Sequence, residues 1–394
     1  MNGGLICCRN NLERLNSDPG IECSALVASH PAIAAETLDY FHSKNIRGEF
    51  IPFQEPQRGP DGLPSSGNLP WSKRRWPFPH EIEGWEQSHI GAALEAHISA
   101  NSPDIVVVDY LPSALYVPKL YKSGIPIVTI TLNREADYYD ELARLGQTFY
   151  GKPANRVAAF RLRMFEKLTH WRSKAIVAIG RYDVPQRYMG RPRAFWIPPY
   201  LDPVLEPWSY SATNSLYFVG NRGHYPNGLA IEWIATEFAP ELQRLNPTIK
   251  VRIVGASVHD VPEHWLVPNI EYLGFADEET VRTLFTTEDV LLVPIDNNFG
   301  AKFKVAEAIA FGTPLLATKA AMSGVSFLPW LPNIQLEKPA EAARLARDLV
   351  ADAAALRGMS KRIRSEAQSY IQMHEGEWTT VLRAVLGRLS GNGR

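Results

Sequence analysis

The chain has 394 residues, of which 45% are hydrophobic and 21% charged, and its formal net charge is −1. These values are typical of a globular protein with room for two domains. The near-zero net charge gives no overall electrostatic field that would attract nucleic acid. No apolar run reaches the roughly 18 residues that a membrane-spanning helix needs, and no charged-then-apolar leader opens the chain. The three cysteines have no metal-ligand spacing, so we expect a reducing cytoplasm and buried thiols at Cys7, Cys8 and Cys23.

Apolar runs and helical patterns alternate through the first half of the chain. The alternation is typical of a parallel sheet covered on both faces. An opening helix over LICCRNNLERL precedes any strand, so the first strand of the usual order is missing or supplied differently. The predicted strands are IECSALVAS, GEFIPF, PDIVVVD, PIVTIT, KAIVAI and RAFWIPP, and the predicted helices between them are Ala32–Ser43, Glu83–Ala100 and Ala154–Trp171.

Two segments break this alternation. Gln54–His80 is rich in Pro, Gly and Ser and too long for a simple connection, which indicates a mobile or functional loop. Pro198–Asn214 is proline-rich without periodicity and is the best domain boundary. The alternation then restarts and ends in a helical region over Ala340–Leu386. Its predicted elements are SLYFVG, the helix Asn227–Leu245, IKVRIVG, NIEYLGF, the helix Glu278–Phe285, DVLLVPI, a short lysine-bearing helix and PLLAT.

The segment Phe299–Gly324 holds the most informative turn. It follows the predicted strand DVLLVPI and leads into a short helix that carries Lys302, Lys304 and Glu307 and stops at Gly312. Ligands bind at the carboxyl ends of strands in open α/β sheets, and helix N-termini attract phosphate. The pattern therefore predicts a nucleotide-sugar site. The alternative is a solvated face of a short helix.

Three other predicted strands of this half end in glycine, at Gly220, Gly255 and Gly274. Glycine lets a backbone approach a ligand closely. Gly220 is followed by Asn221 and Arg222, and the Arg222 guanidinium can pair bidentately with phosphate. Pro226-Asn227 then stand at a helix start. The alternative for each of these features, taken alone, is an ordinary turn.

Together these motifs resemble the carboxyl-terminal domain of the GT-B glycosyltransferases, above all the large retaining group 1, or family 4-like, enzymes. The resemblance covers roughly Ser215–Gly324. It follows the order VGNRGHYPNG, RIVG, NIEYLGF, VLLVPI and GAKFKVAEAIAFGTPLLAT. It implies an α/β fold of two Rossmann-like domains facing a cleft, with the last helix crossing back to the first domain.

The resemblance implies a role for each matching residue. Glu307 would accept hydrogen bonds from ribose hydroxyls, and Lys302 and Arg222 would neutralise the diphosphate as it leaves. Phe299 departs from the family pattern, because many relatives have a sugar-contacting glutamate there. The remaining donor-binding positions are Gly3 and Gly4 as a glycine loop, and Gly220, Asn221, Asn227, Gly255, Gly274, Phe299, Gly300, Ala301 and Lys304.

The first half offers a candidate base. Asp109 ends a predicted strand and would act as general base for the acceptor hydroxyl in an inverting enzyme, or would cap the next helix. Asn133 and Glu135 follow another strand in the same way, and structural and functional roles stay open for both. A retaining enzyme needs no such base, so the stereochemistry also stays open.

The implied activity is transfer of a sugar from a UDP- or GDP-type nucleoside diphosphate sugar to a hydroxyl acceptor, in bacterial polysaccharide, glycolipid or other glycoconjugate assembly. Residues 1–200 would bind the acceptor, residues 201–373 the donor, and residues 374–394 would pack on the first domain. No DxD-type carboxylate pair occurs, so we expect no obligatory metal or other cofactor. The alternatives are a non-catalytic nucleotide-sugar-binding module and a GT-B sugar-nucleotide epimerase.

Two segments that combine basic and aromatic residues bear on the binding partners of the protein. Trp71–Phe78 combines tryptophans with adjacent cations, and Lys152–Lys174 carries many Lys and Arg against Glu166 alone. Either would suit peripheral contact with anionic lipid near a lipid-linked acceptor, at the inner face of the membrane. The alternative is a loop and a solvated helix face. No nucleic-acid partner is expected.

Overall fold

The computed structural model describes residues 3–53, 87–109, 111–145, 152–185, 193–199, 207–288, 290–325, 327–374 and 376–391. The predicted loop Gln54–His80 and the segment Trp71–Phe78 lie outside these residues. The chain forms two compact units. The N-terminal unit comprises Asn2–Ile197 and Gly376–Arg394, and the C-terminal unit comprises Pro198–Glu375.

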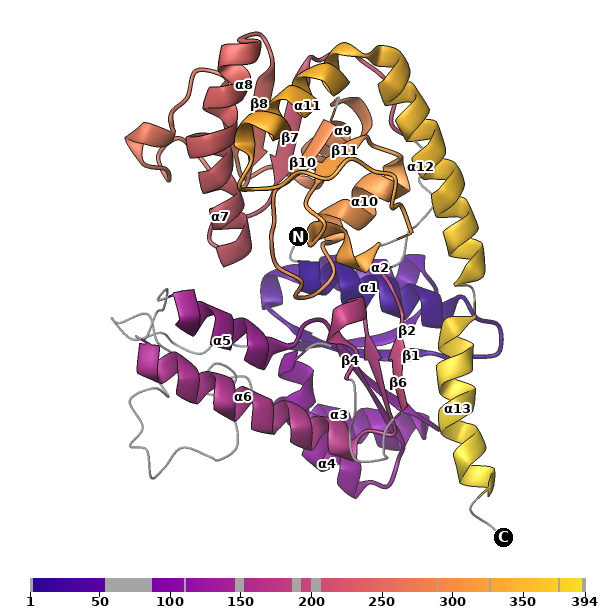
Figure 1. The fold of residues 1–394 in the computed structure, drawn as a ribbon. Helices are drawn as coiled ribbons and strands as arrows, with labels where there is room; N and C mark the ends of the chain where they lie inside the picture. Colours follow the sequence, from indigo (N-terminus) through magenta and orange to yellow (C-terminus); the bar gives the residue numbers. More distant parts are fainter. Residues whose placement is uncertain are drawn as a thin grey trace. The chain divides into compact units, whose positions relative to one another are not determined.

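The N-terminal unit contains two parallel sheets (Figure 1). Strands β1 (Ser24–Ser29) and β2 (Arg47–Pro52) pair with each other. The second sheet has the order β3-β4-β5-β6, from strands β3 (Val106–Asp109), β4 (Ile127–Thr131), β5 (Ala175–Ala178) and β6 (Arg193–Trp196). All the strands predicted for this half are present, and Ile127, Val128 and Ile176 are fully buried, as strands covered on both faces require.

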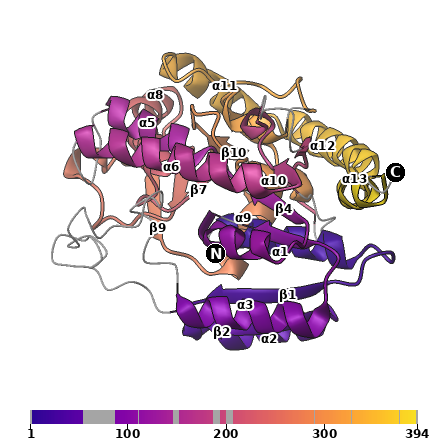
Figure 2. The ribbon, with the colours of Figure 1, turned by 90° about the horizontal axis from the view of Figure 1, so that it is seen from below.

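The helices of this unit cover the sheets. Helix α2 packs on β2 through Phe41, and α3 lies against β1 (Figure 2). Helices α5 and α6 lie side by side. The helices are α1 (Gly3–Asn16), α2 (Ala34–Ser43), α3 (Ser88–Asn101), α4 (Val117–Lys122), α5 (Glu135–Leu145), α6 (Lys152–Arg172) and α13 (Glu377–Gly391).

The two ends of the N-terminal unit contact each other. Arg14 of α1 forms an ion pair of 3.6 Å with Glu377 of α13, and Thr379 donates a hydrogen bond to Asp18. The structure also corrects one expectation. Gly3 and Gly4 begin helix α1, so the prediction of a glycine loop at this point is wrong. The LICCRNNLERL segment forms a helix, as its sequence predicts.

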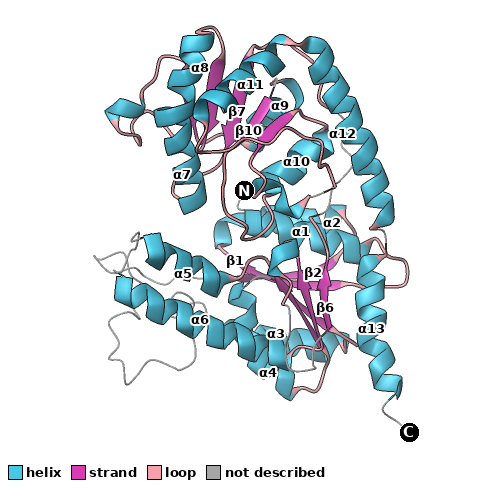
Figure 3. Cartoon of the chain, viewed as in Figure 1, coloured by secondary structure: helices cyan, strands magenta, loops and turns pink. Residues whose placement is uncertain are grey.

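The C-terminal unit contains one parallel sheet with the order β11-β10-β7-β8-β9. Figure 3 shows β7 and β10 side by side in this sheet. Its interior positions are fully buried, among them Tyr217, Phe218 and Leu292. Strand order reverses between β7 and β10, as in doubly wound folds. The strands are β7 (Ser215–Val219), β8 (Lys250–Val254), β9 (Ile270–Gly274), β10 (Val290–Val293) and β11 (Leu315–Ala317).

The helices of this unit follow the predicted alternation, with one irregularity. The predicted helix Asn227–Leu245 begins at Tyr225 and passes through a π-helical segment, Ile234–Phe238. Pro240 lies in the first turn after this segment and lacks the N–H that would bond one turn back, which accounts for the wider turn. The helices are α7 (Tyr225–Trp233), α8 (Ala239–Leu245), α9 (Glu278–Thr287), α10 (Phe303–Phe311), α11 (Pro339–Ala351) and α12 (Ala353–Met373).

Helix starts in this unit use the residue types that cap helices. The Asp277 side chain accepts a hydrogen bond of 2.8 Å from the backbone N–H of Thr280 and so caps α9. Asp352 caps α12 in the same way, through the N–H of Ala355 at 2.9 Å. Across both units, the described helices include none that is long and apolar enough to pass through a membrane.

Candidate functional site

The C-terminal unit brings most of the predicted donor-binding residues to one edge of its sheet. Strands β7 and β10 are neighbours, and strand order reverses between them. The turn Gly220–Asn227 leaves the carboxyl end of β7, and residues 294–302 leave the carboxyl end of β10. In open α/β sheets ligands bind outside the strand ends at such a reversal.

The three strand-end glycines pack backbone against backbone. Gly220 N donates to Val254 O at 2.9 Å, Arg222 N to Gly255 O at 2.9 Å, and Gly255 N to Gly274 O at 2.7 Å. Gly255 has φ +98°, and a Cβ on it would lie 2.4 Å from Gly220 O. A side chain therefore does not fit at Gly255, and the sequence signal of a glycine after β8 has a steric reason.

Lys304 of α10 joins the two turns of this edge. Its Nζ donates a hydrogen bond of 2.8 Å to Asn227 Oδ1 and lies 4.1 Å from the centre of the Phe218 ring. A Cβ on Gly220 would lie 2.7 Å from Lys304 Nζ, so the glycine leaves the space that the ammonium fills. Burial, and then the charge of Lys302, lower the pKa of Lys304 to about 7.

Lys302 lies immediately before α10, at its N-cap position, rather than within the helix. Its ammonium donates to Asn297 Oδ1 at 2.9 Å and to the carbonyl oxygen of Phe299, which fixes it over the turn after β10. Gly300 supplies the positive φ, +63°, that this turn needs. Ala301 packs near Gly324, where a Cβ would lie 2.9 Å from that of Ala301. Phe299 contributes to this turn the backbone carbonyl group that accepts the Lys302 bond.

Glu307 lies one helical turn after Lys304, on the same face of α10. Burial raises the pKa of Glu307 to about 7, while the charge of Lys304 acts in the opposite direction. Among the residues that the structure describes, none forms a hydrogen bond or ion pair with its carboxylate. The carboxylate oxygens can therefore accept hydrogen bonds from a ligand.

The turn after β7 adds a second group of positive charge. The described part of the chain provides no ion pair for Arg222, whose Cζ lies 5.5 Å from the centre of the Trp265 ring. Burial lowers the pKa of His224, and the charges of Lys304 and Lys302 lower it further. Asn221 orders the turn by accepting a 2.8 Å hydrogen bond from Gly223 N. The edge of the sheet therefore presents cations beside one carboxyl group, which suits a ligand with phosphates and hydroxyls.

The candidate residues of the other half belong to the N-terminal unit. Asp109, at the end of β3, accepts a hydrogen bond of 3.0 Å from Asn11 Nδ2 on α1. The Asp109 charge also contributes to the raised pKa of the Cys7 and Cys8 thiols, after burial as the main cause. Gly3 and Gly4 form the start of the same helix α1. A catalytic or capping role for Asp109 stays a prediction.

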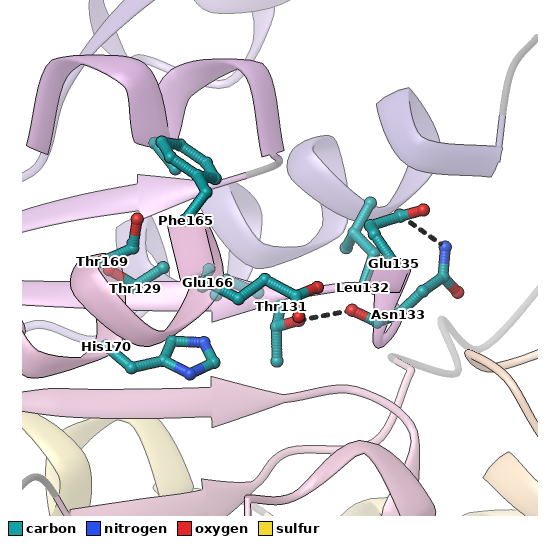
Figure 4. Close-up of a pocket in the computed structure, with 11 residues that line it drawn as sticks. Thr129, Thr131, Leu132, Asn133, Glu135, Phe165, Glu166, Thr169 and His170 are labelled. Carbon is teal, nitrogen blue, oxygen red and sulfur yellow. Dashed lines mark hydrogen bonds between the residues drawn. The ribbon is translucent and has the colours of Figure 1, made fainter. Parts of the chain in front are cut away.

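A small cavity of about 30 Å³ lies at the carboxyl end of β4 (Figure 4). The volume that one water molecule occupies in the liquid is about 30 Å³, so the cavity is too small for a sugar ring. Its lining residues are Ala114, Thr129, Ile130, Thr131, Leu132, Asn133, Glu135, Phe165, Glu166, Thr169 and His170.

The titratable groups of this cavity are at least partly buried, and two of them accept hydrogen bonds. Glu166 of α6 accepts a hydrogen bond of 3.3 Å from Ala136 N in the first turn of α5, and burial raises its pKa to about 7. Glu135 accepts from Asn133 Nδ2 at 3.0 Å, and burial raises its pKa as well. Burial lowers the pKa of His170 to about 4. Glu166 thus links α6 to the N-terminus of α5.

Comparisons with known proteins agree with this geometry. Residues 213–328 match the family model described as Glycosyl transferases group 1, whereas no curated protein sequence matches the chain. HepE from Anabaena, solved in complex with UDP and glucose, is similar over 99% of this chain and 96% of its own, with a TM-score of 0.62 and 14% identity. The chain has the GT-B fold.

Other solved structures share this GT-B fold. Sucrose-phosphate synthase from Thermosynechococcus elongatus aligns with a TM-score of 0.60 and 14% identity, over 94% of this chain and 98% of its own. TarM aligns with a TM-score of 0.56 and 11% identity over 74% of this chain, and the match spans only 58% of TarM. The predicted fold class of two Rossmann-like domains is confirmed.

Some features of this GT-B chain escaped the sequence analysis. Trp265 contacts Arg222 from a loop after β8, and only the three-dimensional structure brings the two together. Asn297, which binds Lys302, carried no signal beyond being polar in a turn. Within the described ranges, no group of three or more His, Cys, Asp or Glu side chains could hold a metal ion. The expectation that no metal is obligatory stays a prediction.

Proposed function

We propose that this protein is a glycosyltransferase that moves a sugar from a nucleoside diphosphate sugar to a hydroxyl acceptor. The observation that supports this most is that Lys304 and Glu307 lie on one face of α10, at the strand-order reversal of the C-terminal sheet. Cations and a carboxylate on neighbouring positions match a ligand that carries both a diphosphate and a ribose. Residues 201–373 would bind this donor and residues 1–200 the acceptor.

Each side chain would have a separate task in the reaction. Lys302, fixed over the turn after β10, and Arg222, free of ion pairs within the described residues, would bind the diphosphate and stabilise the charge that develops as it leaves. Glu307 would accept hydrogen bonds from the ribose hydroxyls. Asp109 would take the acceptor proton if the reaction inverts configuration. In a retaining reaction the leaving diphosphate would take that proton instead.

A thermal-shift panel of UDP-, GDP-, ADP- and TDP-sugars tests the donor site. UDP is the first candidate, because the structurally similar HepE was solved with UDP and glucose. A ligand at about a hundred times its dissociation constant stabilises the folded protein by about 2.7 kcal/mol. Glu307→Ala should lose the shift, whereas Glu279→Ala, at an exposed position on α9, should keep it. A full shift in Glu307→Ala, or none in the wild type, contradicts the proposal.

A binding module without turnover is the second candidate function. Phe299 favours it, because many relatives of this fold have a sugar-contacting glutamate there and a phenylalanine side chain has no carboxylate for such a contact. Slow hydrolysis of the bound sugar nucleotide, or transfer to an added acceptor, would support the enzyme. Tight binding with neither reaction, across all sugars that bind, would support the module.

We also propose that the outer face of α6 contacts an anionic membrane, which would place the enzyme near a lipid-linked acceptor. Phe160 and Trp171 on this helix are 52% and 50% exposed, and Tyr121 of α4 lies beside Trp171 with ring centres 5.7 Å apart. Arg156 and Lys167 are exposed on the same helix. Exposed aromatic rings among cations suit the headgroup region of anionic lipid.

A further inference from the structure

Arg222 is held by its backbone and by one aromatic ring. Its N–H donates to Gly255 O at 2.9 Å, which fixes its backbone against the end of β8. Its guanidinium lies over Trp265, with Cζ 5.5 Å from the ring centre. A guanidinium that stacks by its face keeps its N–H edge available, and that edge binds phosphate bidentately.

Trp265 is itself held in a fixed position. It ends a short 3-10 helix, Glu263–Trp265, and is only 6% exposed. Its backbone N–H donates to Pro262 O at 2.9 Å, and its carbonyl oxygen accepts from Tyr272 Oη at 3.0 Å. The backbone of Trp265 is therefore anchored to β9 as well as to its own loop, and burial keeps the indole in place as a platform.

Asp260, an acidic side chain whose pKa the charge of Arg222 affects, is already bound elsewhere. Asp260 Oδ2 accepts hydrogen bonds from Ser257 Oγ at 2.6 Å and from Ser257 N at 3.2 Å. These bonds lower the pKa of Asp260, and the charge of Arg222 adds to the effect as a smaller cause. In the described residues the guanidinium therefore meets an aromatic face rather than a carboxylate.

We propose that Trp265 is a positioning residue, which aims Arg222 at the diphosphate and so sets the preference of this site for nucleoside diphosphates over monophosphates. The inference rests on the proposed function, since it assumes a nucleotide at this edge of the sheet. An aromatic platform orients the cation without competing for its N–H donors, whereas a carboxylate partner would compete with phosphate. Of the residues proposed to bind the diphosphate, Arg222 is the one whose side chain lies over the Trp265 ring, so the effect of Trp265 on the ligand passes through Arg222.

Calorimetric titration with a nucleoside diphosphate and its monophosphate tests the proposal. The pair is UDP and UMP, or GDP and GMP if the thermal-shift panel selects guanine. Trp265→Leu should weaken diphosphate binding about tenfold and monophosphate binding less than about twofold. Trp265→Phe, which keeps a smaller platform, should recover most of the diphosphate affinity. In the background of Arg222→Ala, Trp265→Leu should cause no further loss, because the group that it positions is gone.

The role of Trp265 would be overturned if Trp265→Leu weakened the affinities for the diphosphate and the monophosphate equally. It would also be overturned if the losses of affinity caused by Trp265→Leu and Arg222→Ala multiplied in the double variant. Circular dichroism and the melting temperature without ligand show whether each variant folds. If Trp265→Leu does not fold, Trp265→Met takes its place because it also removes the aromatic ring, and a ratio of the two affinities equal to the wild type in that variant contradicts the proposal. Wild-type protein that binds neither nucleotide contradicts the proposed function itself.

Discussion

Asn227 Oδ1 accepts a hydrogen bond of 2.8 Å from Lys304 Nζ, although the two residues are 77 positions apart in the sequence. The bond connects the turn after β7 with helix α10 on the other side of the strand-order reversal. Asn227 Nδ2 in turn donates to Asn221 O at 3.1 Å. One side chain thereby fixes both the lysine and the turn that carries Arg222.

Asn227→Ala should lower the free energy of unfolding by about 1–2 kcal/mol, because the half-buried ammonium loses its acceptor and the turn loses a bond. Urea denaturation of the purified protein measures the change. Gln335→Ala, at an exposed position of the same unit, is the control and should stay within about 0.5 kcal/mol of the wild type. Equal stability of the two variants would show that this bond contributes nothing.

Gly255→Ala should destabilise the C-terminal unit by about 2–4 kcal/mol, since it combines a positive φ with a Cβ placed 2.4 Å from a backbone oxygen. Gly274→Ala provides a matched control. Gly274 also has a positive φ, +69°, but no atom lies within 4 Å of an added Cβ, so only the backbone cost of about 1–2 kcal/mol applies. Chemical denaturation should rank the two variants in this order, and the reverse order would contradict the packing of these turns.

The affinity for the sugar nucleotide that the thermal-shift panel selects should pass through a maximum near pH 7. Glu307, with its pKa raised to about 7, becomes a carboxylate as the pH rises, and a carboxylate accepts ribose hydroxyl bonds better. Lys304, with its pKa lowered to about 7, loses its charge over the same range and gives the falling limb, whereas His224, with its pKa lowered from 6.5, is already neutral there. Titration calorimetry across the range measures the profile.

Glu307→Gln should abolish the rising limb of that profile and leave a weaker affinity that only declines with pH. The donor sugar nucleotide suits this test because its diphosphate is esterified at both ends and does not titrate near pH 7. A rising limb that persists in Glu307→Gln would assign the titration to another group.

Glu166→Gln should stabilise the protein at high pH and not at low pH. The folded-state pKa of Glu166 is raised from 4.5 to about 7, so the wild type is penalised once the pH rises through 7, and the penalty is absent below 4.5. We expect a gain of about 1–3 kcal/mol at pH 8 that shrinks toward pH 5. Melting temperatures across this range measure it, and Glu36→Gln, at an exposed position of α2, should leave the profile unchanged.

Replacing Phe160 and Trp171 by Ser should reduce binding to vesicles that contain about one third phosphatidylglycerol in phosphatidylcholine. The exposed rings provide the apolar contact and the neighbouring cations the attraction, so binding should also fall with added salt. Flotation of the wild type and the variant measures the effect. Phe275→Ser, which removes a ring that is 74% exposed in the other unit, is the control. Wild-type protein that fails to float with anionic vesicles contradicts the membrane proposal.

The sequence by itself determined the α/β class, nearly every strand and the position of the turn that we propose binds the donor. These features depend on local information, because buried parallel strands are continuous apolar runs and a side chain added to a glycine with positive φ or at a close approach causes strain or a clash. Gly220, Gly255 and Gly274 are examples, since each lies at the end of a strand that its own residues define.

Only the tertiary structure decided which distant side chains meet. The Asn227–Lys304 bond, the stacking of Arg222 on Trp265 and the bond from the Ala136 N–H to Glu166 each depend on strand order or helix packing, which no local pattern specifies. The same holds for the start of the chain, where Gly3 and Gly4 form part of a helix although glycines also suit a loop. The pKa values of Lys304, Glu307 and Glu166 are likewise properties of the fold, because burial sets them.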